Sequence, residues 1–257
     1  MPIPVKVNFT PMQNQVSPEE WEARVNLAAC YRLVAHYGWD DLIANHISMR
    51  VPGPEDHFLL NPFGLMFHEI TASSLVKVDL AGNLMSESEY KINKAGYIIH
   101  SAIHEHRPDA TCVFHTHSTS GMAVSAHRDG LLPLAQSSMV ALSSLTYHDY
   151  EGVALNPEEK ARLVADLGNE WTMILRNHGL LTCGISAVDA FYRLYFLERA
   201  CDVQVAALAG GAPLVFPSEE VQTRTKKQGA GAFGKGANLA WPALIRLMDA
   251  KDPSFRD

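Results

Sequence analysis

The chain has 257 residues, of which 47% are hydrophobic and 19% are charged, and its formal net charge at pH 7 is −7. This length supports one sizeable hydrophobic core and makes a single domain the default. The sequence has no run of about 18 uncharged apolar residues, so we expect no transmembrane helix. The acidic balance gives no general attraction to nucleic acid or to an anionic membrane, and we expect neither as a partner.

The N-terminus and the cysteines indicate the compartment. The first six residues lack the basic region and apolar core of a secretory signal. No pairing motif links the four cysteines, which are Cys30, Cys112, Cys183 and Cys201. We therefore expect a cytoplasmic protein with reduced thiols that serve as packing residues.

The N-terminal part predicts one helix followed by a small sheet. Ser17 can cap a helix that has Pro18 in its first turn, and Gly38 can stop it, which predicts a helix over residues 18–37. Short β-branched or alternating runs then predict an antiparallel meander of three strands, at residues 47–51, 58–60 and 75–79.

The middle of the chain alternates predicted helices and strands. Helical spacing of apolar residues begins at Asn93 and closes at Arg107-Pro108-Asp109, and a β-branched and aromatic run predicts a strand over residues 111–117. A capping signature at Asn156-Pro157 opens a further helix, which should end at Gly168. Residues 172–175 follow as a buried strand.

A long helix from about Ala187 to Ala209, capped by Ser186, is apolar on most of its circumference. We expect it to pack on two sides, one of which would suit a neighbouring subunit.

The C-terminal tail predicts little regular structure. We expect a flexible or partner-contacting loop over the glycine-rich residues 229–236 and a short last helix at about residues 241–248. The loop has GxGxxG spacing, but no strand precedes it, which argues against a dinucleotide site. The basic run at residues 224–227 is expected to be solvated.

Two histidines, His115 and His117, are spaced for one face of a strand. Residues i and i+2 of a strand lie about 6.7 Å apart on the same face, so both imidazoles can bind one metal ion at about 2.0–2.1 Å. His178, just past the strand at residues 172–175, is a candidate third ligand. In a chain with 12 histidines, a chance pair and a structural His178 stay open as alternatives.

Three motifs occur in order along the chain: Asn93-Lys94-Ala95-Gly96-Tyr97 through Arg107-Pro108-Asp109, Val113-Phe114-His115-Thr116-His117-Ser118, and Asn177-His178-Gly179-Leu180. Together they resemble the class II aldolase/adducin family, which includes the fuculose- and ribulose-phosphate aldolases. The resemblance covers about residues 20–212, and the segments at 93–96 and 147–152 look closest to the head domain of adducin.

The resemblance implies an α/β fold, a three-layer α/β/α sandwich around a mixed, largely antiparallel sheet. This domain would fill residues 1–212, and residues 213–257 would form the tail. It also implies a homotetramer and a zinc ion bound by His115, His117 and His178 near a subunit interface. Three imidazoles leave iron, manganese and cobalt open as alternatives to zinc.

The binding positions depart from the family in part. The acid/base glutamate of the sugar-phosphate aldolases falls on Gly96, and the serines that hold phosphate fall on Lys94 and Ala95, so a sugar phosphate is a poor substrate candidate. Lys94 is instead a candidate partner for a substrate carboxylate, with a solvated lysine as the alternative. The substrate-binding positions that match the family are Asn45, Ser48 and Gly64.

These features predict a metal-dependent lyase that performs aldol cleavage or decarboxylation on a small carbonyl or hydroxy-acid compound. A Lewis-acidic metal stabilises the charge that develops on the carbonyl oxygen, and decarboxylation suffers less from the loss of the glutamate. The first candidate proton donors are Tyr147 and His148, and the further candidates are Glu87 and Glu89. The alternative is an adducin-like assembly module that catalyses no reaction. A third possibility is a hydrolase that uses metal-bound hydroxide, but no feature of the sequence distinguishes it from the lyase.

Three further histidines are given structural interpretations. His100 and His104, one helical turn apart, are expected to be helix-surface or packing residues. For His46, a hydrogen bond near the anion loop at residues 61–64 is the less favoured interpretation.

Overall fold

A seven-stranded sheet forms the centre of the computed structural model, which describes residues 9–53, 56–85, 88, 90–152, 158–231 and 233–257, without the side chains of Lys94 and Ala95. The strand order is β3-β2-β1-β4-β7-β6-β5, and each neighbouring pair is antiparallel except β5 and β6. The predicted mixed, largely antiparallel sheet is therefore confirmed. The strands are β1 (His46–Arg50), β2 (His57–Leu60), β3 (Val76–Asp79), β4 (Cys112–Thr116), β5 (Leu145–His148), β6 (Thr172–Leu175) and β7 (Gly179–Gly184).

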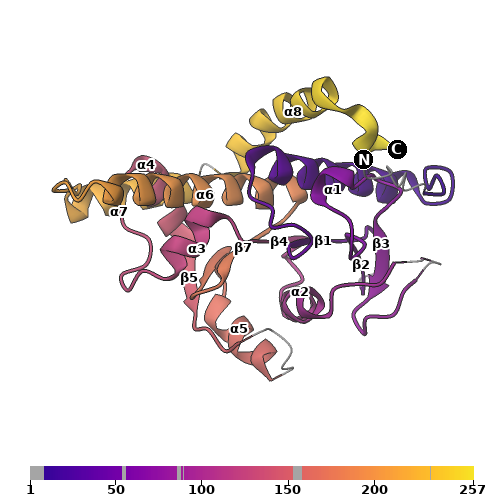
Figure 1. Cartoon of the computed structure of the whole chain (residues 1–257), viewed down its shortest axis with the longest axis horizontal. Helices are drawn as coiled ribbons and strands as arrows, with labels where there is room; N and C mark the ends of the chain where they lie inside the picture. Colours follow the sequence, from indigo (N-terminus) through magenta and orange to yellow (C-terminus); the bar gives the residue numbers. More distant parts are fainter. Residues whose placement is uncertain (1–8, 54–55, 86–87, 89, 153–157, 232) are drawn as a thin grey trace, which may run out of the picture.

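Helices cover both faces of this sheet, which confirms the predicted α/β/α sandwich. Figure 1 shows α1, α3 and α6 over one face, and α2 and α5 over the other. The helices are α1 (Pro18–Tyr37), α2 (Lys94–His106), α3 (Thr119–Ser125), α4 (Gln136–Ala141), α5 (Glu159–Leu167), α6 (Ala187–Ala209), α7 (Glu219–Ala230) and α8 (Phe233–Lys251), with 3-10 turns at Phe67–Glu69, Leu142–Ser144 and Pro253–Arg256. Among the described residues, no helix is long and apolar enough to cross a membrane.

The two longest helices begin where their capping residues predict. The Ser17 hydroxyl accepts a hydrogen bond from the Glu20 amide at 3.2 Å, and α1 ends at Gly38, whose φ of 72° suits glycine. The Ser186 hydroxyl accepts from the Asp189 amide at 3.1 Å and opens α6. The predicted opening of α5 at Asn156-Pro157 lies outside the described residues.

Tyr31 fastens α1 to the first two strands. Its fully buried hydroxyl accepts hydrogen bonds from the Ile47 amide at 3.1 Å and from the Asn61 amide at 2.9 Å, and it donates to the Ile47 carbonyl. Because a buried polar group is stable only when it is hydrogen-bonded, this one side chain fixes the position of α1 over β1 and β2.

Arg107 explains the Arg-Pro-Asp motif in structural terms. Its guanidinium forms an ion pair with Asp109 at 2.8 Å and donates to the carbonyls of Gly168 and Glu170. It also lies 4.7 Å from the centre of the Trp171 ring. The motif therefore joins the turn after α2 to the loop after α5.

The expectations for the tail are wrong in two respects. Residues 219–230 form α7, which carries the basic run, and the last helix extends from Phe233 to Lys251 rather than over residues 241–248. The glycines allow close helix packing: a Cβ at Gly229 would lie 3.0 Å from Val140 of α4, and one at Gly236 would lie 2.6 Å from the Tyr192 hydroxyl of α6. In Figure 1, α8 crosses the outer side of α1 and α6, so α6 is covered on two sides as predicted.

Gly184 offers a test of how closely α6 packs on the sheet. A Cβ there would lie 2.4 Å from the Ala190 amide nitrogen, a backbone atom that cannot turn aside. We expect Gly184→Ala to destabilise the protein by about 1–3 kcal/mol in urea unfolding. Gly210→Ala is the control, because no atom lies within 4 Å of its added Cβ. Equal midpoints for the two variants would contradict this account of the packing.

Candidate metal centre

Three histidines meet where the end of β4 lies beside the start of β7. The Nε2 atom of His115 lies 2.8 Å from that of His117 and 3.2 Å from that of His178, and the last two are 3.1 Å apart. The close approach of the end of β4 to the start of β7 depends on Gly179, because a Cβ there would lie 2.4 Å from the Thr116 carbonyl oxygen. The structure thus brings together the three histidines singled out from the sequence.

Burial keeps these imidazoles neutral. It lowers the pKa of His115 well below its usual value and lowers that of His178 to about 4. Repulsion between protonated imidazoles, from His178 on His115 and from His117 on His178, adds to this lowering. The pKa of His117 is also lowered by burial, against the opposing effect of Asp41. A neutral imidazole is the form that binds a metal ion.

The hydrogen bonds of the other ring nitrogens fix the tautomers. Nδ1 of His115 faces the Leu180 carbonyl at 2.9 Å, and Nδ1 of His117 faces the Asp41 carboxylate at 3.2 Å. Both partners only accept, so both Nδ1 atoms donate, and both Nε2 atoms present lone pairs to each other.

The donor set fits a small cation. Lone pairs at 2.8 Å repel each other unless a positive charge lies between them. Three nitrogens bound at about 2.0–2.1 Å to a tetrahedral ion would lie about 3.3–3.4 Å from one another, close to the spacing of these histidines. The hydrogen bond from His117 to Asp41 supplies the carboxylate that often orients a ligand histidine.

An imidazole fills the space beside Gly96. A Cβ at position 96 would lie 2.3 Å from Cδ2 and 2.5 Å from Nε2 of His46, so no larger residue fits there unless His46 moves. The His46 ring also lies against that of His115, with 5.0 Å between the centroids. The aldolase glutamate and the His46 side chain therefore exclude each other in this chain.

A chain of buried hydrogen bonds leads from His46 into α2. His46 Nδ1 lies 2.7 Å from His100 Nε2, and the Ser48 hydroxyl lies 2.6 Å from His100 Nδ1 and 2.7 Å from His104 Nε2. All four residues are at most 4% exposed. His100 and His104 are therefore packing residues and not surface residues, and the hydrogen-bond partner of His46 lies on α2.

The residues proposed from the sequence for substrate binding lie in different surroundings. Asn45 is fully buried, and neither polar atom of its amide has a hydrogen-bond partner among the described residues. Ser48 is engaged with the α2 histidines. Gly64 is exposed, with a φ of 111° that suits glycine, and Lys94 is the first residue of α2, with its side chain outside the described part.

The proposed proton donors lie on opposite faces of β5. The Tyr147 hydroxyl accepts from the Leu131 amide at 3.0 Å, and its ring lies under the Arg176 guanidinium. His148 Nδ1 faces the Asp166 carboxylate at 2.7 Å, and His148 lines a cavity of about 10 Å³, room for about one water molecule, with His178 and Tyr150. Glu87 and Glu89 lie outside the described residues.

Two carboxylates near the centre were missed in the sequence. Asp41 sits in the loop after α1, next to Leu42, whose positive φ no periodicity indicates. Glu198 lies within the buried part of α6, and a charged residue in an apolar helix was the signal that could have revealed it.

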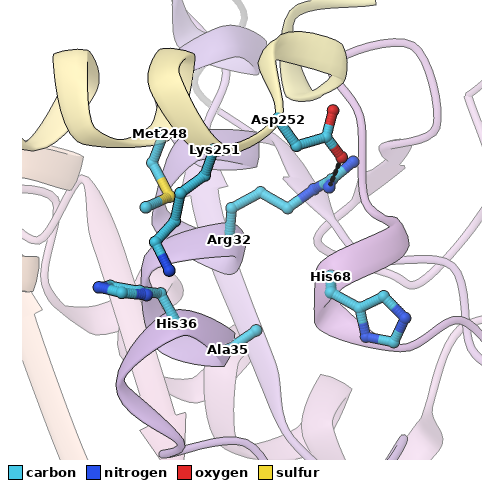
Figure 2. A pocket seen from close by; sticks show the side chains of 7 residues that line it. All are labelled: Arg32, Ala35, His36, His68, Met248, Lys251 and Asp252. Atoms are coloured by element: carbon cyan, nitrogen blue, oxygen red, sulfur yellow. Dashed lines mark hydrogen bonds and ion pairs between the residues drawn. The ribbon is translucent and has the colours of Figure 1, made fainter.

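A second concavity, of about 280 Å³, lies between α1 and α8 (Figure 2). Its basic side chains include Arg32, which donates to Asp252 at 2.8 Å, and Lys251, which lies above His36. None of the candidate site residues lines it, and α1 separates it from the sheet. This concavity is therefore separate from the histidine centre.

Comparison with known proteins agrees with the fold. Residues 25–205 match the Class II Aldolase and Adducin N-terminal domain. A Pseudomonas aeruginosa protein, named provisionally as a class 2 aldolase, is 59% identical over 249 residues, which are 95% of this chain and 96% of that protein. The crystal structure of an aldolase II superfamily protein from Pseudomonas syringae is 51% identical, covers 96% of this chain and 99% of its own, and gives a TM-score of 0.93.

Rat alpha-adducin is 42% identical over 242 residues, which are 88% of this chain and 33% of the adducin. The chain belongs to the class II aldolase and adducin family.

Proposed function

We propose that this chain is a metal-dependent lyase that breaks a carbon–carbon bond next to the carbonyl group of a small carbonyl or hydroxy-acid compound. The observation that supports it is the convergence of the Nε2 atoms of His115, His117 and His178. When bound, a divalent ion, with zinc as the first choice for three imidazoles, would supply a Lewis acid for the oxygen that gains negative charge.

Position 96 favours decarboxylation over aldol cleavage. Aldol cleavage needs a base that removes a hydroxyl proton, whereas decarboxylation does not. Gly96 offers no such group, and the His46 ring that fills its space has its Nδ1 occupied by His100. We therefore place a small carboxylic acid with a neighbouring carbonyl first among substrates.

Two groups beside His178 are candidates to return a proton to the product. His148 lines the same small cavity as His178, and the half-exposed Tyr150 has its ring centroid 6.3 Å from that of His178. The hydroxyl of Tyr147 is held by the Leu131 amide, which favours a role in positioning β5 over proton transfer.

Asn45 is the best-supported substrate-binding residue. A buried amide without a partner is costly, and a substrate oxygen or an ordered water would remove that penalty. Lys94, at the start of α2, would add a positive charge for a carboxylate.

Metal content tests the proposal directly. We expect about one zinc per chain after metal-free protein is titrated, and almost none in the His115→Ala/His117→Ala variant, because one imidazole alone holds zinc weakly. The His36→Ala/His68→Ala variant, which removes two exposed histidines, is the control and should bind like the parent. A folded parent that takes up no zinc, iron, manganese or cobalt would overturn the proposal.

The alternative is an adducin-like assembly or binding module. The similarity to alpha-adducin and the glycine at position 96 favour it. A metal-free, folded and oligomeric parent would support this alternative. In both cases we propose a homotetramer in the cytoplasm, and light scattering measures the number of subunits.

A further inference from the structure

Glu198 is a buried carboxyl group that the proposed chemistry does not use. It lies on α6, is 0% exposed, and accepts hydrogen bonds from the Thr116 hydroxyl at 2.7 Å and from the Ser118 hydroxyl at 2.5 Å. Within the described part of the chain, its hydrogen-bond partners are these two hydroxyls and no cationic group.

Those two hydroxyls stand on either side of His117. Thr116 is the last residue of β4, and its side chain projects to the face opposite that of His115 and His117. Ser118 follows His117, and its hydroxyl also accepts from the Gly121 amide at 3.0 Å, which opens α3. One carboxyl group therefore holds the backbone both before and after a candidate ligand.

The same network reaches the third histidine. At the far end of α3 the Ser125 carbonyl accepts from the Asn177 amide at 3.3 Å, directly before His178. A shift of α3 would therefore move the segments that carry His117 and His178 together.

Stability alone gives little reason for a carboxyl group at this position. The neighbouring buried residues of α6 include Leu194, Leu197 and Cys201, so a leucine at position 198 would suit the packing. Burial of the group raises its pKa to about 7, which shows how unfavourable the surroundings are for its charge. One documented use of a buried polar group kept at such a cost is to fix one particular geometry.

We propose that Glu198 is a positioning residue of the histidine centre: it fixes Thr116 and Ser118 so that the imidazole of His117 faces those of His115 and His178. This inference rests on the proposed metal site, because the geometry it protects is the one that a metal ion requires.

The test compares four folded proteins: the parent, Glu198→Leu, Glu198→Gln and Gln204→Leu. Leucine keeps the apolar volume and removes both acceptors, whereas glutamine keeps an acceptor for one hydroxyl and a donor for the other. Gln204 is the matched control, because it is also fully buried on α6 but bonds to Leu132, Gly130 and the His127 ring instead. Affinity for Co²⁺, whose visible absorption reports coordination geometry, is measured beside the thermal midpoint.

We expect Glu198→Leu to weaken Co²⁺ binding by about 10–100-fold and to alter the absorption spectrum, as outer partners of ligands typically do. Glu198→Gln should lose less than about tenfold, and Gln204→Leu should bind like the parent although its thermal midpoint falls. Parent-like affinity and spectrum in Glu198→Leu would overturn the inference, as would an equal loss in Gln204→Leu.

Histidine NMR of the metal-free proteins separates this inference from the proposed function. The imidazole nitrogen signals of His117 should broaden or shift in Glu198→Leu and stay unchanged in Gln204→Leu. A parent that binds no metal would refute the proposed function alone, and unchanged His117 signals in Glu198→Leu would refute the positioning role.

Discussion

Replacing Gly96 by alanine should destabilise the protein by about 1–3 kcal/mol, and replacing it by glutamate should destabilise it more. The added Cβ would lie 2.3–2.6 Å from three atoms of the His46 ring, which is 4% exposed and tied to His100. Alanine would otherwise favour a helix by about 1 kcal/mol over glycine, so the sign of the effect identifies the clash. For a chain of this size, thermal unfolding should shift by about 2–4 °C per kcal/mol.

Replacement of His46, the residue that the new side chain would meet, provides the control for the Gly96 variants. In a His46→Ala background, Gly96→Ala and Gly96→Glu should both be tolerated, because the ring that excludes a side chain has gone. A double-mutant cycle measured by urea unfolding should therefore give a favourable coupling between positions 46 and 96. Additive effects would show that the imidazole does not exclude a larger residue at position 96.

Metal-free protein should lose stability steeply as the pH falls below about 6.5. Six histidines are buried or half-buried as neutral imidazoles, and burial lowers the pKa of His104 to about 3 and that of His178 to about 4. In the unfolded chain they protonate near pH 6.5, so below that pH the unfolded state binds more protons and is favoured. Their stabilising contribution is complete above pH 6.5 and is lost progressively down to the folded pKa values.

His104 isolates this effect from metal binding, because it lies outside the candidate ligand set. At about 1.4 kcal/mol per pKa unit, His104 alone should account for several kcal/mol by pH 3. His104→Gln keeps a polar partner for Ser48 but cannot take up a proton. Urea unfolding between pH 7.5 and 4 should show a shallower pH dependence for the variant than for the parent. Identical slopes would exclude His104 as a source of acid lability.

The titration of Glu198 changes the stability of the folded state with pH in the direction opposite to that of the histidines. Burial raises its pKa to about 7, so the folded state holds a proton between pH 7 and about 4.5 that the unfolded chain releases. One carboxyl group offsets only a small part of the proton uptake of the six histidines, so the net fall in stability between pH 6.5 and about 4.5 is slightly shallower than the histidines alone would give.

The sequence was informative where local chemistry alone decides the structure. Ser17, Gly38 and Ser186 determine helix ends through bonds to their own neighbours, and these ends are observed as predicted. The pair His115 and His117 needed only the twofold repeat of a strand. His178 was a candidate because it lies just past a buried strand, but only the pairing of β4 with β7 brings it to the other two histidines.

The wrong expectation for the glycine-rich segment and the missed carboxylates have a different cause. The glycines at positions 229 and 236 indicate a loop when only propensity is considered, yet each lets one helix approach another closely. Asp41 and Glu198 act on residues that are 76 and 82 positions away in the chain. No local pattern encodes such pairs, because the tertiary fold creates them.

Arg107 belongs to a motif that identifies the family but has a structural role. Its motif helped to identify the family, yet its side chain braces a turn against Asp109 and Trp171 and does not contact the three histidines. Selection for a sound turn would preserve this motif whether or not the reaction survives. The motif therefore reports that the turn is kept and not that the reaction is kept, whereas the residues at positions 46 and 96 lie beside the histidine centre itself.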